Sequence, residues 1–356
     1  MIEERIKNLQ NFLEDNQAAI ITDDKNRLYF TGFASSAGTV IITKHNSFLL
    51  IDFRYFEKAK ALVSSSRVIL CERLYDQLNQ LFKDLNIKEI LLESDNVTLS
   101  QLNTFKEKFS GVEINTENSL SKQINLLRSI KSDEEIESII KAQKLTDLTF
   151  SYILTKIKTG MTEKEIMLDM EFLMRDAGSE GTAFDFIVVS GKNSSLPHGV
   201  PTDKRIENGD FITMDFGAVV NGYRSDMTRT VAIGEITDKQ RLVYDTVLKA
   251  QSVSLKSIKP QTECKEIDRI ARDIISDAGF GNCFGHGLGH SVGLDIHENP
   301  ALNTRDTTPL QKGMIMTVEP GIYIENEFGV RIEDMVVVTE DGCQNLTHSP
   351  KELIIL

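Results

Sequence analysis

The stretch Gly285-His-Gly-Leu-Gly-His-Ser-Val-Gly-Leu-Asp-Ile-His-Glu298 contains three of the six histidines of the chain, His286, His290 and His297. Four glycines lie among them, and glycine lets the backbone come close to whatever the imidazoles hold. Neutral imidazole is the commonest side-chain metal ligand and a frequent acid or base near neutral pH. The stretch therefore predicts a metal or catalytic site, and the simpler alternative is a glycine-rich surface loop with scattered polar residues.

The composition of the chain is that of a globular protein with more than one domain. Its 356 residues exceed the size at which a single core usually stops growing, so we expect two domains. Its 40% hydrophobic and 26% charged residues are ordinary for a soluble protein. A formal charge of −13 disfavours nucleic acid or an anionic membrane as a partner and is compatible with cation binding.

The sequence pattern predicts a cytoplasmic protein. Residues 1–20 lack the apolar region of a signal peptide, and no apolar run approaches the roughly 18 residues of a membrane span. The cysteines form no Cys-x-x-Cys pair, which favours reduced thiols over a disulfide framework.

The first third of the chain alternates helical and extended patterns. Thr39–Thr43 and Ser47–Asp52 are apolar runs separated by a short polar turn, which predicts a β-hairpin. Helices are expected at Ile2–Leu13, Leu74–Leu85 and Leu99–Phe109. The pattern indicates an α/β unit with a mixed sheet.

Three capping boxes mark the beginnings of later helices, at Ser132–Glu135, Thr162–Glu165 and Thr237–Gln240. The first box follows the last strand pattern of the α/β unit, so the domain boundary is expected just before it. We assign residues 1–125 to an N-terminal α/β domain and residues 126–356 to a C-terminal domain.

The C-terminal domain repeats its own sequence at an offset of about one hundred residues, longer than the period of a solenoid. The matching pairs are Met161–Gly178 with Gln261–Gly279, Gly209–Gly217 with Gly313–Gly321, and Arg224–Asp226 with Arg331–Glu333. These overlays occur in the same order in both halves. They predict a pseudo-two-fold domain with carboxylates at equivalent strand positions.

Four acids occupy these equivalent positions: Asp215 and Asp226 in the first half, Glu319 and Glu333 in the second. Burying carboxylates together costs several kcal/mol per ion, unless a cation neutralises them. The alternative is that each acid pairs with a nearby arginine, namely Arg224, Arg229 or Arg331.

Four carboxylates and one imidazole would be a hard, mostly oxygen ligand set. Such a set suits Mn²⁺, with Zn²⁺ or Co²⁺ also possible. Two divalent ions about 3.5–4 Å apart can share bridging carboxylates and a hydroxide that attacks carbonyls at neutral pH.

Residues from about 130 onward resemble the creatinase/aminopeptidase, or pita-bread, family, and the whole chain resembles an Xaa-Pro peptidase (prolidase or aminopeptidase P). The motifs are Leu196–Gly199, Met214–Gly217, Ser225–Arg229, Gly287–Gly293, Thr317–Tyr323 and Val330–Asp334. In the N-terminal domain, Tyr29–Phe33 and Asp52–Tyr55 resemble the family less specifically. The resemblance implies a creatinase-like α/β N-terminal domain followed by an α+β pita-bread catalytic domain.

The resemblance also implies the metal ligands. The five ligands of the family fall on Asp215, Asp226, His290, Glu319 and Glu333. Asp226 and Glu333 would bridge two ions, most readily Mn²⁺. Asp215 would bind one of them, and His290 with Glu319 the other.

The activity implied is hydrolysis of an Xaa-Pro peptide bond by a metal-bridging hydroxide. Glu319 would accept the proton of the nucleophile and pass it to the departing proline nitrogen. His297 would help to stabilise the oxyanion, while His198 and His286 would hold the substrate. Arg331 would orient the carboxylates that bind the metal. The partners implied are proline-containing dipeptides or short peptides, and a second copy of the chain in a homodimer.

Arg305 is a further candidate, because true dipeptidases of this family have an arginine near this position that binds the free carboxylate of the substrate. A guanidinium can hold a carboxylate through two parallel hydrogen bonds. The alternative is a solvated arginine paired with Asp306.

Two other functions remain open at this point. Some members of the fold have lost their metals and act as binding modules, and a non-proline metallo-aminopeptidase would share the same ligands. The preference between dipeptides and longer Xaa-Pro peptides is also open.

Overall fold

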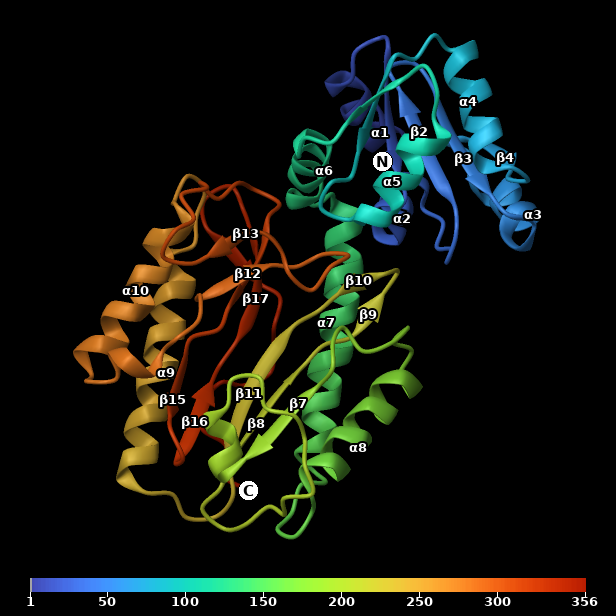
Figure 1. Ribbon diagram of the computed structural model, residues 1–356. Coiled ribbons are helices and arrows are strands. Elements are labelled where there is room, and N and C mark those ends of the chain that lie inside the picture. The colour runs from blue at the N-terminus through green and yellow to red at the C-terminus, as the bar shows by residue number, and fades with distance from the viewer. Residues whose placement is uncertain (1) are drawn as a thin grey trace. The chain divides into compact units, whose positions relative to one another are not determined.

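The computed structural model describes residues 2–356, which divide into two compact units, one ending at Arg128 and the other comprising Ser129–Leu356 (Figure 1). Over these residues, no helix is both long enough and apolar enough to cross a membrane.

The N-terminal unit is an α/β unit built on one six-stranded sheet of order β4-β3-β2-β1-β5-β6. Its strands are β1 (Gln17–Ile21), β2 (Thr39–Thr43), β3 (Ser47–Ile51), β4 (Arg67–Leu70), β5 (Glu89–Leu92) and β6 (Glu113–Asn115). Its helices are α1 (Ile2–Phe12), α2 (Asp24–Thr31), α3 (Phe53–Leu62), α4 (Leu74–Asp84), α5 (Leu99–Lys108) and α6 (Ser119–Ser129).

The sheet is mixed, as the sequence predicts. Strand β1 pairs antiparallel with β2 and parallel with β5, and the expected hairpin is the antiparallel pair β2 and β3. Every residue of β2 is buried, which is why its sequence is a continuous apolar run rather than an alternating one. The three helices expected from periodicity begin at their predicted residues.

The C-terminal unit contains four long helices and several small sheets. The helices are α7 (Asp133–Ile153), α8 (Glu163–Asp176), α9 (Asp238–Ser257) and α10 (Cys264–Asp277), with the short 3₁₀ helices η1 (Gly191–Ser195) and η2 (Gly281–Cys283). The strands of the first half are β7 (Ile187–Ser190), β8 (Phe211–Phe216), β9 (Val219–Val220), β10 (Tyr223–Arg224) and β11 (Met227–Ala232). Those that follow are β12 (Gly289–Ser291), β13 (Glu298–Leu302), β14 (Ile315–Val318), β15 (Gly321–Ile324), β16 (Phe328–Arg331), β17 (Asp334–Val338) and β18 (Cys343–Asn345).

The predicted capping boxes are present at the beginnings of α7, α8 and α9. In each case the side chain of the N-cap residue (Ser132, Thr162 or Thr237) accepts a hydrogen bond from the backbone N–H of the residue three positions later. The side chain of that later residue accepts a hydrogen bond from the backbone N–H of the N-cap residue. These reciprocal bonds satisfy backbone donors that the helix itself leaves free, so each helix begins where its box predicts.

The internal repeat is visible in the order of elements. Two helices, α7 and α8, precede β8, the ribbon β9-β10 and β11; then α9 and α10 precede β14, the ribbon β15-β16 and β17. Strand β8 lies in a sheet of order β11-β8-β7, and β14 in one of order β13-β12-β14-β17-β18. The fold is therefore the predicted pita-bread arrangement of two similar halves.

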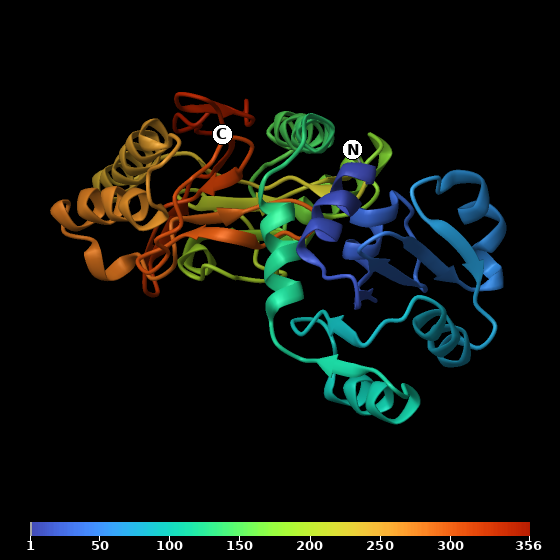
Figure 2. The ribbon, with the colours of Figure 1, turned by 90° about the horizontal axis from the view of Figure 1, so that it is seen from above.

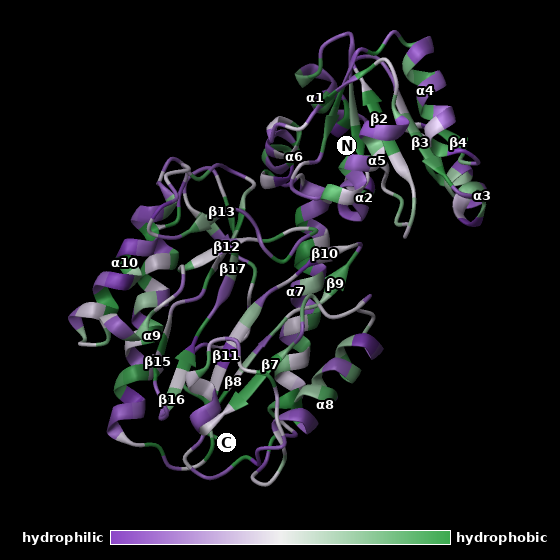
Figure 3. Ribbon diagram, in the orientation of Figure 1, coloured by the Kyte–Doolittle hydropathy of each residue, from purple (hydrophilic) through white to green (hydrophobic). Residues whose placement is uncertain are grey.

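Each half has its own core. One core gathers Phe150, Ile166 and Met214 with residues of α7, α8 and β8, and the other gathers Val247 and Ile267 with residues of α9 and α10. Figures 1 and 2 show α9 and α10 side by side against the strands. Helix α10 is hydrophobic along one face only, as its mixed colour in Figure 3 shows, so it covers the sheet with that face.

Candidate metal centre

A cavity of about 1020 Å³ opens in the C-terminal unit. Among its lining residues are all the site residues that the sequence predicts except Arg305. They are His198, Asp215, Asp226, His286, His290, His297, Glu319, Arg331 and Glu333. The fold thus brings together side chains from both halves of the repeat.

The four acids lie at equivalent places in the two halves, but the expectation that all of them lie within strands is wrong. Asp215 lies within β8, whereas Glu319 follows the last residue of β14. Asp226 and Glu333 directly precede β11 and β17. Asp226 follows the two-stranded ribbon β9-β10, and Glu333 follows the ribbon β15-β16. Both residues therefore lie between strands rather than within one. Pro320, after Glu319, has no N–H with which to continue the pairing.

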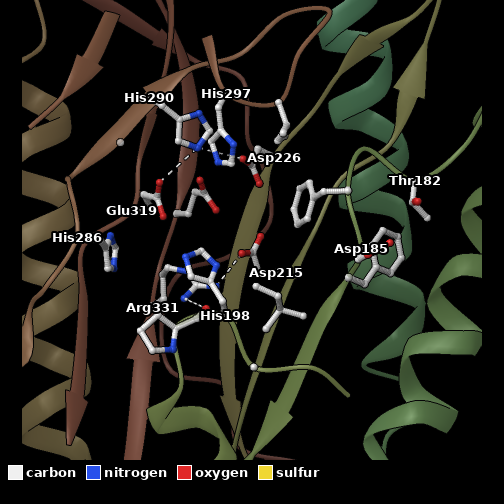
Figure 4. Close-up of a pocket in the computed structure, with 18 of the residues that line it drawn as sticks. Thr182, Asp185, His198, Asp215, Asp226, His286, His290, His297, Glu319 and Arg331 are labelled. Carbon is white, nitrogen blue, oxygen red and sulfur yellow. Dashed lines mark hydrogen bonds and ion pairs between the residues drawn. The ribbon is translucent and has the colours of Figure 1, made fainter. Parts of the chain in front are cut away.

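The donor atoms of Asp226, His290 and Glu333 lie within 4.8 Å of one another. The Nε2 atom of His290 lies 3.6 Å from Asp226 Oδ2 and 3.4 Å from Glu319 Oε1. Figure 4 shows the side chains of His290, Asp226 and Glu319 pointing toward one another. His290 Nδ1 lies 3.1 Å from the carbonyl oxygen of Ser291, which can only accept, so Nδ1 carries the hydrogen. The lone pair on Nε2 therefore faces the acids.

The buried acids resist ionisation when no cation is bound. Burial raises the pKa of Asp226 and Glu333 well above their ordinary values, and neighbouring carboxylates raise it further. Burial likewise raises the pKa of Glu319 to about 8. Burial lowers the pKa of His290 to about 4, so the imidazole is neutral and cannot compensate the acids.

Several carboxylate oxygens in this cluster have nothing to bond to among the described residues. Asp215 Oδ1, Asp226 Oδ1 and Glu333 Oε1 are buried and accept no hydrogen bond. Buried polar atoms are normally paired, and buried charges are paired or bind metal. The donor set therefore fits hard divalent cations.

Arginine pairing accounts for only one of the four acids. Arg331 Nη2 donates to Asp215 Oδ2 at 2.7 Å. Arg229 Nη2 instead donates to Asp334 at 2.8 Å, and Arg224 donates to backbone carbonyls. The alternative of one arginine for each acid is therefore wrong.

The other histidines of the cavity differ in the contacts that their rings make within the protein. His286 Nδ1 lies 2.8 Å from the carbonyl of Gly287, and its Nε2 lies 3.0 Å from the hydroxyl of Tyr323. Both ring nitrogens of His286 are thus engaged within the protein, and its contact with substrate stays a prediction, as do those of His198 and His297. These two side chains are exposed to the cavity, and the His297 ring lies 4.4 Å from that of His290.

Sequence reasoning missed two uncharged residues of the site. Thr228 Oγ1 donates to Glu333 Oε2 at 2.7 Å, and Tyr323 OH accepts from Arg331 Nη1 at 2.8 Å. Both residues lie within motifs that resemble the family, but neither can ligate strongly or carry charge. Their spacing along the chain did not indicate which residues they contact.

Arg305 does not reach the cavity. It is exposed, and its backbone N–H donates to the side chain of Asn303 in a turn. Asp306, the partner expected in the alternative, accepts hydrogen bonds from the backbone of Ala301 and Thr308. The turn directs Arg305 to the surface, which favours the solvated alternative, and the substrate contact of Arg305 stays a prediction.

The raised pKa values lead to a prediction for the metal-free protein. Its melting temperature should fall as the pH rises from 6.5 to 8, because in this range Glu319 is ionised in the unfolded chain but protonated in the folded one up to a pKa of about 8. The pKa values of His286 and His290 are lowered from 6.5 to about 4, so near pH 6.5 these rings are partly charged in the unfolded chain only. They oppose the fall at the lower end of the range and no longer affect it once the unfolded chain is deprotonated, so the fall should be steepest between pH 7.5 and 8. Calorimetry with and without Mn²⁺ measures the effect.

Mn²⁺ should remove this fall, because the bound acids are ionised at every pH in the range. The variant Glu319→Gln, measured without metal, should show a shallower fall than the unchanged protein. A metal-free melting temperature that stays level or rises between pH 6.5 and 8 would contradict the assignment.

Comparison with known proteins agrees with the geometry. Residues 137–340 match the model of metallopeptidase family M24, and residues 5–130 match that of the creatinase/prolidase N-terminal domain. The chain is 38% identical to an Xaa-Pro dipeptidase of Pyrococcus furiosus over 99% of this chain and 100% of the relative.

Solved structures are similar over the whole chain. An Xaa-Pro dipeptidase from Bacillus anthracis has a TM-score of 0.96 at 40% identity, with 100% of both chains covered. An X-Pro aminopeptidase from Thermotoga maritima has a TM-score of 0.91 at 38% identity, covering 98% of this chain and 100% of the other. The chain belongs to metallopeptidase family M24 and has a creatinase/prolidase N-terminal domain before its peptidase domain.

Proposed function

We propose that this protein hydrolyses the bond between an N-terminal residue and a following proline, in dipeptides or short peptides, with two divalent metal ions as cofactors. The observation that carries the proposal is the convergence of Asp226, His290 and Glu333 on one point of a large cavity, with carboxylate oxygens that lack partners. Relatives described as Xaa-Pro dipeptidases and as an X-Pro aminopeptidase support the substrate class.

We assign the ligands by their positions in the repeat. Asp226 and Glu333, which directly precede equivalent strands, would hold the ions together with Asp215, His290 and Glu319, the five positions that the resemblance to the family implies. The hard donor set favours Mn²⁺, with Co²⁺ or Zn²⁺ as substitutes. When bound, such ions supply Lewis acidity that activates a water molecule and polarises the scissile carbonyl.

The side chains around the acids would move the proton and hold the substrate. Glu319 takes the proton of the attacking water and delivers it to the proline nitrogen as the C–N bond breaks. His297 donates a hydrogen bond to the oxyanion that develops on the carbonyl. His198, at the other end of the row of acids in Figure 4, holds the proline side of the substrate.

Arg331 would keep the acids in place through its hydrogen bonds within the protein. Its Nε donates to Thr228 at 3.0 Å, its Nη1 to Tyr323 and its Nη2 to Asp215. The Tyr323 hydroxyl in turn donates to His286 Nε2, since Nδ1 of that ring carries the hydrogen. These hydrogen bonds link Asp215, a proposed metal ligand, to His286 in the cavity wall, and they fix the positions of both side chains.

The direct test of the proposal is hydrolysis of Xaa-Pro and Xaa-Pro-Yaa peptides by protein loaded with Mn²⁺, with Xaa-Ala-Yaa peptides as the control. Cleavage of the proline peptides, lost with a chelator and regained with Mn²⁺, is the expected result. Equal cleavage of the alanine peptides would make the protein a general metallo-aminopeptidase. Full activity without metal would overturn the proposal.

The structure also leads to a prediction for Arg305. The variant Arg305→Ala should hydrolyse Xaa-Pro and Xaa-Pro-Yaa peptides within about two-fold of the unchanged protein, because an exposed side chain outside the cavity contributes little. Steady-state kcat/KM on both peptides measures this. A loss confined to the dipeptide would restore Arg305 as the group that binds the substrate carboxylate.

The homodimer and the cytoplasmic location expected from the sequence stay predictions. Sedimentation of the purified protein tests the first, and fractionation of its source cells tests the second.

A further inference from the structure

Lys131 is a buried cation outside the cavity wall. It lies just before the capping box that begins α7, and its side chain is 1% exposed. Its ammonium donates to Ser291 Oγ at 2.9 Å and to Glu298 Oε2 at 3.1 Å, and the Glu298 side chain is 8% exposed. A buried charge thus holds two residues that are far from it in sequence.

The two partners of Lys131 flank the segment that carries the candidate site histidines. Ser291 follows His290, and its carbonyl oxygen fixes the hydrogen of that ring on Nδ1. Glu298 follows His297. The ammonium therefore bonds to both ends of the segment Ser291–Glu298, one residue away from each imidazole.

Glu298 also organises the inside of this segment. Its Oε1 accepts from the backbone N–H of Asp295 at 3.1 Å. A Cβ atom on Gly293 would lie only 2.5 Å from Glu298 Oε1, so a residue without a side chain is needed where the carboxylate passes. The turn of the segment is thus shaped around the carboxylate that Lys131 neutralises.

Lys131 is itself fixed by the strand system. Its backbone N–H donates to the carbonyl of Gly313 at 3.0 Å, just before β14, the strand that leads to Glu319. Gly313 has a φ of +87°, and a Cβ atom there would lie 3.1 Å from the carbonyl oxygen of Lys131. The backbone of Lys131 is thus joined to the residue that leads into β14.

Stability alone is a weak reason for such a pair. Replacing a buried ion pair by apolar residues is often neutral or stabilising, whereas removing one partner leaves an uncompensated charge. Lys131, Ser291 and Glu298 do not line the cavity, so they cannot touch substrate. Whatever they contribute to the reaction passes through His290 and His297.

We infer that Lys131 is a positioning residue, whose ammonium holds the segment Ser291–Glu298 so that His290 faces the metal ligands and His297 faces the substrate. The inference rests on the proposed metal centre. Residues that orient metal ligands usually change metal affinity or activity by about 10–100-fold when they are replaced.

The test compares Lys131→Met with Lys204→Met, both measured below their melting temperatures. Lys204 forms a partly buried ion pair with Asp210 at 2.6 Å in the same unit but does not line the cavity, so its loss controls for general destabilisation. Titration of the metal-free protein with Mn²⁺ should show one site weakened by about 10–100-fold in Lys131→Met and unchanged in Lys204→Met. The kcat for an Xaa-Pro peptide should fall to a similar extent.

The double variant Lys131→Met/Glu298→Gln separates positioning from stability. It removes both charges, so its melting temperature should recover relative to Lys131→Met, while the Mn²⁺ affinity should stay weak. Recovery of affinity together with the melting temperature would overturn the inference and leave the pair a structural one.

Two further outcomes are informative. If Lys131→Met does not fold, Ser291→Ala removes one arm of the contact and keeps the ion pair, and it should still weaken Mn²⁺ binding; unchanged binding would count against the inference. If the unchanged protein binds no Mn²⁺, the proposed metal centre fails, whereas equal binding by the unchanged protein and Lys131→Met overturns only the role of the lysine.

Discussion

The variants Asp226→Asn and Glu333→Gln are expected to lose peptidase activity to a similar extent, by about 10³-fold or more. Each residue directly precedes an equivalent strand of the repeat, and each has a buried oxygen without a hydrogen-bond partner. An amide keeps the shape of the side chain but removes the negative charge that would bind the metal ions. Metal catalysis is worth several kcal/mol, and about 1.4 kcal/mol corresponds to ten-fold in rate.

The measurement is kcat/KM for an Xaa-Pro peptide in Mn²⁺, together with the metal content of each purified variant. Both variants should contain less metal than the unchanged protein. Asp210→Asn is the matched control, because Asp210 is a largely buried acid of the same unit that pairs with Lys204 away from the cavity. If either ligand variant kept near-normal activity and metal content, the equivalence of the two halves at the site would be wrong.

Replacing His198 or His297 by alanine is expected to lower turnover by about 10²–10⁴-fold while both metal ions stay bound. This range is typical of a lost acid–base or oxyanion group. Both side chains are exposed to the cavity, from opposite halves of the repeat, and neither belongs to the proposed ligand set. The effect should therefore appear in kcat rather than in metal content.

Single-turnover kinetics and elemental analysis measure the two quantities separately. His45→Ala serves as the control. His45 is an exposed residue of the N-terminal unit, and its ring forms a hydrogen bond with the exposed Asp15. Loss of a metal ion from His198→Ala would move His198 into the ligand set. Unchanged turnover in His297→Ala would remove it from the reaction.

The features that were predicted correctly follow from short-range rules. The hairpin β2-β3, the three capping boxes and the repeat are each encoded by residues close together or by matching motifs. The acids were grouped correctly because buried charge is costly and their positions matched. What failed were features that depend on the path of the chain in space.

Arg305 shows how much depends on that path. The resemblance to the family suggested a contact with substrate, but a turn closed by the Asn303 side chain directs Arg305 outward. His286 has both nitrogens engaged because Tyr323 happens to lie opposite it. Lys131 meets Ser291 and Glu298 from across the sequence, and no local pattern announces such a contact.

The repeat has a consequence for how the site came about. Two identical half-length chains related by a two-fold axis would each supply one acid of an equivalent pair, and Asp226 and Glu333 occupy such equivalent positions. A symmetric pair of this kind must treat both ions alike. Gene duplication and fusion would have removed that constraint, because each copy can then change alone.

The strand register shows where the copies diverged. Ser291 pairs with Met316 on β14, and at the equivalent place Ser190 pairs with Ile212 on β8. His290 therefore corresponds to Val189, a buried residue of β7. Only one half of the protein carries an imidazole at this position. Two ions bound as proposed would therefore have chemically distinct surroundings, which allows a division of labour between them that a symmetric pair of half-length chains could not have.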